Sequence, residues 1–153
     1  MNIFKFVKNH CNKTPVDIYH IIRELGINLK FIKMDEDVSG YIKCIRDGSY
    51  TIVINNAHSK TRKRFTAAHE LGHYLIHRDL IGDGTDDNLS YRQSGKRFKN
   101  NILDEHETQA NMIAVGILMP RCLIEEKLDT PYQILAEEFG VSEEAMKIRL
   151  RTY

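Results

Sequence analysis

Hydrophobic residues recur at helical spacing near the start of the chain. In TPVDIYHIIRELG, residues 14–26, isoleucine and leucine fall on one face of a helix. Thr14 is the predicted N-cap, Pro15 the first helical residue and Gly26 the residue just past the end. We expect this helix to place its apolar stripe against a core.

The pattern changes to alternation between residues 28 and 54. NLKFIKM and GYIKCI alternate apolar and polar positions, which predicts strands with one buried face. SYTIVI follows the pair Asp47-Gly48, which favours a hairpin turn. This region is therefore expected to form a small antiparallel sheet.

Two long helices are predicted further along the chain. One covers roughly residues 59–77 and opens with the basic run KTRKR; the other lies in DEHETQANMIAVGILMP, residues 104–120, and ends near its proline. Residues 78–101, between them, are glycine-rich and charged and have no clear period. That composition predicts a long loop, and loops of this length inside a domain are often functional.

The remaining segment, residues 122–153, is predicted to be a helical tail. Thr130-Pro131 would open one helix, Gly140 would end it, and Ser142 would cap the next. The expected fold class is α+β, with a small antiparallel sheet packed on a mainly helical body.

Composition narrows the class of protein. Of 153 residues, 42% are hydrophobic and 28% are charged, and the net charge is +1. These values predict one globular domain over residues 1–153, with no global attraction to nucleic acid or to a membrane. No apolar run approaches the ~18 residues that span a bilayer, and lysines interrupt the apolar residues where a secretory signal would be continuous. The cysteines are Cys11, Cys44 and Cys122. We expect them to be small buried hydrophobic residues in a reducing environment, which predicts a cytoplasmic protein.

The first predicted long helix carries the motif HELGH. His69 and His73 are four residues apart, so both imidazoles lie on one helical face and can reach one ion. Glu70 is rotated by about 100° from His69. It therefore suits a role as a base acting on water rather than as a ligand. Two ligands would hold a metal weakly, so a third is expected elsewhere.

Glu107, on the second long helix, is the best candidate for this third ligand. Asn111 follows four residues later on the same face, where its side chain could accept the Nδ1–H of a ligand histidine. Two histidines and a glutamate leave one position of a zinc ion open, which is typical of catalytic zinc sites. Zinc fits this donor set, and manganese and iron remain alternatives.

The other histidines fit a metal site less well. His69, His73 and His77 together would rise about 12 Å along a helix, too far to share one ion. His77 is therefore expected to pack near the site or to support a ligand. His106 is expected to point away from the ligand face, toward solvent.

These motifs resemble the ImmA/IrrE-type metallopeptidases of bacteria and their mobile elements. The likeness rests on HELGHYLIH followed by ETQANMIAVGILMP, and the order of the surrounding elements extends it over most of the chain. The family often has phenylalanine where this chain has Ile113. The resemblance implies that His69, His73 and Glu107 bind zinc and that Glu70 is the catalytic base. It also implies a substrate: a helix-turn-helix transcriptional repressor, often encoded nearby, which the peptidase cleaves or inactivates.

Peptide hydrolysis also needs a donor that stabilises the oxyanion. Tyr91, between the two motif helices, is the first candidate and Tyr74 the second, although an exposed tyrosine without this role is the simpler interpretation of each.

A second hypothesis, favoured by the helix-turn-helix-like tail, is a metal-containing regulator that binds DNA or a protein partner without proteolysis. Basic clusters that could contact DNA phosphate or an acidic substrate bear on it too. Two such clusters are Lys60, Arg62, Lys63 and Arg64, and Arg92, Lys96, Arg97 and Lys99. A solvated helix face is the simpler interpretation of the first. The tail has a helix-turn-helix pattern, but residues 131–153 carry three basic and four acidic side chains. Packing or substrate docking therefore fits the tail better than DNA binding.

Overall fold

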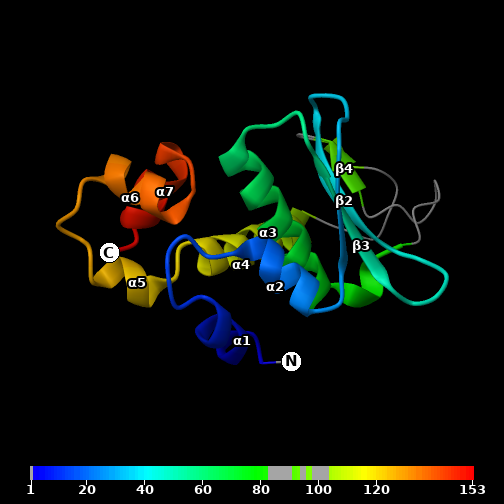
Figure 1. Ribbon diagram of the computed structural model, residues 1–153, viewed down its shortest axis with the longest axis horizontal. Coiled ribbons are helices and arrows are strands. Elements are labelled where there is room, and N and C mark those ends of the chain that lie inside the picture. Colours follow the sequence, from blue (N-terminus) through cyan, green and yellow to red (C-terminus); the bar gives the residue numbers. More distant parts are fainter. Residues whose placement is uncertain (1, 83–90, 94–95, 98–103) are drawn as a thin grey trace.

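The structure is a computed structural model that describes residues 2–82, 91–93, 96–97 and 104–153. Its helices are α1 (Ile3–His10), α2 (Ile18–Glu24), α3 (Lys60–Ile76), the 3-10 helix η1 (Arg78–Leu80), α4 (Asp104–Leu118), α5 (Arg121–Glu125), α6 (Tyr132–Phe139) and α7 (Glu143–Leu150). Its strands are β1 (Asn28–Ile32), β2 (Val38–Cys44), β3 (Tyr50–Asn55), β4 (Tyr91–Gln93) and β5 (Lys96–Arg97). In Figure 1, the sheet lies at one end, α3 and α4 in the middle and α5–α7 at the other end.

The predicted α+β class is confirmed, but the sheet is mixed rather than antiparallel. The strand order is β1-β3-β2-β4-β5. Strands β2 and β3 form the expected antiparallel hairpin, whereas β1 pairs parallel with β3. The burial of the strands explains this order. In β3 five of six residues are buried, so it needs neighbours on both sides, whereas β1 is largely exposed and suits an edge.

The sequence predicts a loop over residues 78–101, but part of this segment forms two short strands. Strand β4 pairs antiparallel with β2, and β5 pairs antiparallel with β4. These strands are only three and two residues long. Such short segments have no measurable hydrophobic period, so their pairing could not be predicted from the sequence.

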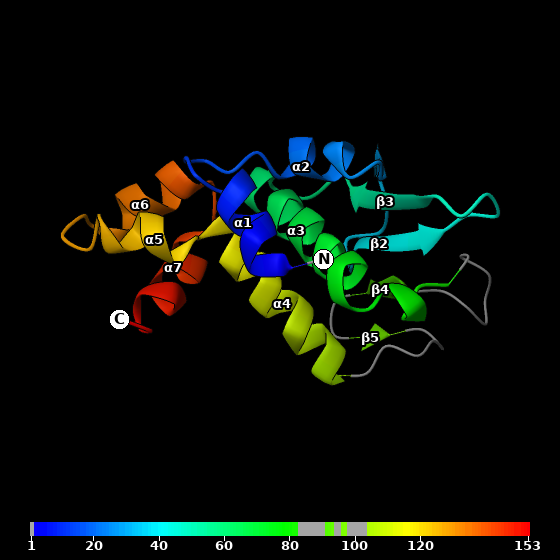
Figure 2. The same ribbon diagram turned by 90° about the horizontal axis from the view of Figure 1, so that it is seen from below.

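Helix α3 packs directly on the sheet, and Gly40 of β2 permits that approach. A Cβ atom at Gly40 would lie 2.5 Å from the backbone oxygen of Val53 and 2.8 Å from Cγ2 of Thr66 on α3. Any side chain there would push the helix away from the sheet. The other face of α3 packs against α4, and Figure 2 shows these two helices side by side behind α1.

The helix boundaries differ from the predictions mainly at the start of α2. Asp17 is the N-cap, and its side chain accepts a hydrogen bond from the backbone N–H of His20. The predicted cap, Thr14, instead donates to Oε1 of Glu138, which lies on α6. Gly26 has a φ of 76°, as expected for a residue that ends a helix. Helix α1 was not expected; Asn2 caps it and Phe6 buries its ring.

The tail is helical as predicted. Gly140 ends α6 with a φ of 66°, and the hydroxyl of Ser142 accepts the backbone N–H of Ala145 at the start of α7. The two helices pack together, and Leu135 and Phe139 of α6 and Met146 of α7 are each 0% exposed. No helix in the described part of the chain has the length and apolar character that crossing a bilayer requires.

Candidate metal centre

Small and apolar residues place the middle of α3 between the sheet and α4. Ala67, Ala68 and Leu71 are 0% exposed, so this part of the helix is surrounded by other elements. His69, one turn before His73, is therefore 8% exposed, and His73 is 1% exposed. Buried polar rings need hydrogen-bond partners or a metal ion, because water does not reach them freely.

Gly72 sets the distance between the two motif helices. A Cβ atom at this position would lie 3.0 Å from the backbone oxygen of Ala110 and 3.1 Å from its Cα on α4. Contacts that short are rarely tolerated, so a larger residue would move α4 outward. The glycine of HELGH and the alanine of ETQAN thus bring the side chains of α4 to the histidines of α3.

Three donor atoms converge where the helices meet. Nε2 of His69 lies 3.1 Å from Nε2 of His73 and 3.1 Å from Oε2 of Glu107. Nε2 of His73 lies 3.5 Å from Oε1 of Glu107. Four-coordinate zinc with bonds of ~2.0–2.1 Å places neighbouring ligand atoms about 3.3–3.4 Å apart. The three side chains therefore have both the chemistry and the spacing that one ion requires, and they alone among the described residues form such a cluster.

Asn111 orients the first of these histidines. Its Oδ1 lies 2.7 Å from Nδ1 of His69. An amide oxygen can only accept, so Nδ1 of His69 carries the proton and its Nε2 presents a lone pair to the other donors. This arrangement agrees with the contact predicted from the spacing of Glu107 and Asn111.

Glu70 lies next to His69 on α3 and is 2% exposed. The role of a base that its place in the motif predicts remains a prediction. Among the tyrosines, Tyr91 has its side chain outside the described residues. The ring of Tyr74 packs edge-on against Tyr50, with centroids 5.1 Å apart, and beneath the guanidinium of Arg78.

His77 and His106 lie close to the donors without joining them. Nδ1 of His77 lies 3.0 Å from Nδ1 of His73, and its Nε2 lies 2.7 Å from Oε1 of Gln109.

The prediction that His106 is exposed is wrong: its side chain is 19% exposed, and its ring centroid is 4.6 Å from that of His77. Gln109 had not been anticipated. Its i, i+3 spacing from His106, which puts both on one face of α4, was the available signal.

The basic run at the start of α3 serves a structural purpose at one position. Arg64 is 7% exposed and donates to the backbone oxygens of Val16 at 2.8 Å and Gly140 at 3.0 Å. Burial lowers the pKa of this guanidinium. The expected solvated face holds for Lys60 and Arg62, which are exposed, and is wrong for Arg64. The second basic cluster (Arg92, Lys96, Arg97 and Lys99) has its side chains outside the described residues.

The cysteines are unpaired thiols, as predicted, but they are not all buried. Cys11 is buried, Cys44 is half-buried and Cys122 is exposed. Burial raises the pKa of the Cys11 thiol to about 12, which keeps it protonated and unreactive.

Comparison with known proteins supports the same interpretation of the motifs. Two radiation response metalloproteases named IrrE are similar: the one from Deinococcus radiodurans is 38% identical over 112 residues, which are 68% of this chain and 28% of the relative. The one from Deinococcus deserti is 37% identical over 111 residues, 67% of this chain and 33% of the relative. The chain thus spans about a third or less of the length of these relatives. The uncharacterized immunity region protein 2 of Bacillus phage phi105 is 23% identical over 130 residues, 85% of this chain and 73% of the relative.

The similarity to this family is not limited to the two motifs but extends over most of the chain. The profile of the IrrE N-terminal-like domain matches residues 22–151, which include both motif helices, the hairpin and most of the tail. This chain therefore belongs to peptidase family M78, the family of the IrrE N-terminal-like domain.

Proposed function

We propose that this chain is a zinc-dependent endopeptidase with His69, His73 and Glu107 as the metal ligands. The observation that carries the proposal is the convergence of these three donors from two helices at spacings of 3.1–3.5 Å. The donor set of two imidazoles and one carboxylate suits zinc, and it leaves room for substrate as catalytic sites require.

Each side chain near the donors has a role in this proposal. When bound, zinc would supply a Lewis acid that polarises a peptide carbonyl and makes water easier to ionise. Glu70 would accept a proton from water and deliver it to the leaving amine. Its 2% exposure supports this role because a proton held there exchanges slowly with bulk solvent. Asn111 would keep His69 in the tautomer that binds metal. Tyr91 remains the candidate donor to the oxyanion.

The proposed substrate is a helix-turn-helix transcriptional repressor encoded near this protein on a mobile element or in a stress operon. The family resemblance supports this choice, as do the names of two kinds of relative: radiation response metalloprotease and phage immunity region protein. The names refer to a radiation response and to a phage immunity region. We infer that removal of a repressor would turn on gene expression in both settings.

The test is a cleavage assay with the zinc-loaded chain and the repressor encoded by the neighbouring gene. We expect defined fragments by mass spectrometry, and their loss in the variant Glu70→Gln by about 10²–10⁴-fold in rate. Zinc content should stay unchanged in this variant, because Glu70 is not a ligand. Cleavage at the wild-type rate by Glu70→Gln would remove this residue from the mechanism.

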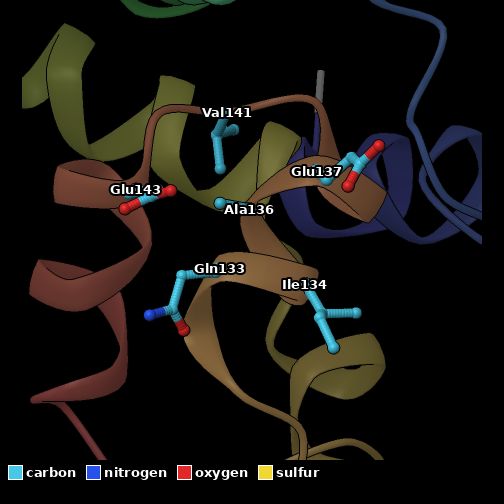
Figure 3. A pocket seen from close by; sticks show the side chains of 6 residues that line it. All are labelled: Gln133, Ile134, Ala136, Glu137, Val141 and Glu143. Carbon is cyan, nitrogen blue, oxygen red and sulfur yellow. The ribbon is translucent and has the colours of Figure 1, made fainter.

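The second candidate function is a non-proteolytic regulator that binds DNA or a protein partner. The observation in its favour is the pair α6–α7, joined by the short turn that contains Gly140. The charges oppose DNA binding by this pair. A hollow of about 350 Å³ lies between α6 and α7, and no basic side chain of the described residues lines it. Figure 3 shows the side chains that line it, among them the carboxylates of Glu137 and Glu143.

The basic residues of α7 contact the protein itself. Lys147 lies over the ring of Tyr132, and Arg149 donates to the backbone oxygen of Met119. A DNA-shift assay under salt titration tests this alternative beside the cleavage assay. Salt-dependent binding of operator DNA without any cleavage of the repressor would reverse the order of the two candidates.

A further inference from the structure

A chain of hydrogen-bonding side chains leads from the surface of α4 to the donor cluster. Oε1 of Gln109 lies 2.7 Å from Nε2 of His77. Nδ1 of His77 lies 3.0 Å from Nδ1 of His73. Nε2 of His73 is one of the three converging donor atoms. Gln109 and His73 are thus linked through both nitrogens of one imidazole.

The direction of the hydrogen bonds follows from the amide at the outer end. The oxygen of Gln109 can only accept, so Nε2 of His77 must carry a proton and donate it. A neutral imidazole with a proton on Nε2 has a lone pair on Nδ1. That lone pair can accept only if Nδ1 of His73 carries a proton. Nε2 of His73 then presents its own lone pair to His69 and Glu107, as a metal ligand must.

The surroundings of His77 make this chain of hydrogen bonds rigid. His77 is 5% exposed and His73 is 1% exposed, so water cannot readily replace either partner. The ring of His106 lies against that of His77, with centroids 4.6 Å apart, and limits its rotation. Hydrogen bonds in such an environment are stronger than in water, and an unmade one is costly.

The two ligand histidines are thus oriented by two amides of the same helix. His69 is held directly by the side-chain oxygen of Asn111, at 2.7 Å. His73 lies one turn further along α3, and the amide of Gln109 reaches it only through His77. We propose that His77 and Gln109 are positioning residues for metal binding, which hold His73 in the tautomer with Nδ1 protonated and Nε2 free. This inference rests on the proposed function, because it assumes that the donors bind zinc.

The first test measures zinc affinity by competition with a chromophoric chelator. His77→Leu removes the acceptor for His73, and the loss of such a supporting partner weakens metal binding by about 10–100-fold. In His77→Asn, Oδ1 can take the place of Nδ1, so affinity should return to within about threefold of the wild type. Equal losses in both variants would overturn the proposal, because the acceptor would then be irrelevant.

Gln109 allows a test without disturbing the core, because it lies on the exposed side of α4. Gln109→Met keeps the shape but removes the acceptor, and it should weaken zinc binding by about threefold to tenfold. The matched control is Gln133→Met, the same change at an exposed position on α6. Equal zinc affinity in Gln109→Met and Gln133→Met would count against the proposal even if His77→Leu failed to fold.

The second test uses nitrogen–proton NMR of the ring groups in the zinc-loaded protein. We expect slowly exchanging protons on Nδ1 of His73 and on Nε2 of His77, and fast exchange of the latter in Gln109→Met. A proton on Nδ1 of His77 in the wild type would contradict the proposed direction of the hydrogen bonds. Neither test uses proteolysis, so a protein that binds zinc as described but cleaves nothing would refute the proposed function and leave this inference standing.

Discussion

The helix pairs α3–α4 and α6–α7 differ in what they bury between them. The first pair encloses histidines and a carboxylate whose polar atoms meet across the interface. The second pair contributes Leu135, Phe139 and Met146 to the hydrophobic core, and its carboxylates Glu137 and Glu143 line the hollow of Figure 3. Burying polar groups costs free energy unless they are hydrogen-bonded or bind a metal ion. Clusters of buried polar groups are therefore often found at functional sites. This difference supports the proposal that the chemistry takes place at α3–α4 and that α6–α7 has a packing or docking role.

The largest difference in zinc affinity is expected between two variants, each of which loses one carboxylate from a different pair of helices. Glu107→Ala deletes a proposed ligand and should lower zinc affinity by more than about 100-fold, beyond the effect of losing a supporting residue. Glu137→Ala removes an exposed carboxylate from α6 and should leave zinc affinity unchanged. Metal content by inductively coupled plasma mass spectrometry compares the two. Full zinc content in Glu107→Ala would assign the third ligand to another residue.

A smaller effect is expected where the two helix pairs are joined. Arg64→Met would leave the backbone oxygens of Val16 and Gly140 without the donor they now have. Unfolding free energy should fall by about 2–6 kcal/mol, since each of the two buried acceptors left unmatched costs about 1–3 kcal/mol. Denaturant titration measures this loss. If zinc affinity fell as strongly as stability, the metal centre would depend on the tail, and the proposed division between the two regions would be wrong.

The smallest effect concerns the spacing of α3 and α4. Gly72→Ala forces a methyl group against Ala110 and should cost about 1–2 kcal/mol of stability through overpacking. It should also weaken zinc binding, because Glu107 moves outward with α4. Gly116→Ala is the control: nothing lies within 4 Å of its Cβ position, so it should stabilise the helix by about 0.5–1 kcal/mol. Similar thermal stability and zinc affinity for both variants would show that Gly72 does not set the spacing.

The parts of the molecule that could be predicted from the sequence are those set by local spacing. The i, i+4 pair His69 and His73 lies on one face of any helix, and Glu107 with Asn111 follows the same rule on the next helix. Caps and glycines likewise located the ends of most helices. Local rules also gave the hairpin of β2 and β3, because its turn lies between them.

The remaining features depend on contacts between distant residues. The parallel position of β1 follows from the need of β3 for neighbours on both sides, which no local pattern reveals. Arg64 belongs to a basic run by sequence, yet the fold surrounds it with backbone oxygens from two other segments. The contact of His77 with Gln109 joins residues 32 positions apart. Only the packing of α3 against α4 brings such side chains together.

Anomalous diffraction at the zinc edge, from crystals of the chain purified with zinc, tests the central claim most directly. One strong peak should lie within bonding distance of Nε2 of His69, Nε2 of His73 and a carboxylate oxygen of Glu107, at about 2.0–2.2 Å from each. A peak bonded elsewhere, or one bonded to the two histidines with Glu107 turned away, would contradict the proposed metal centre.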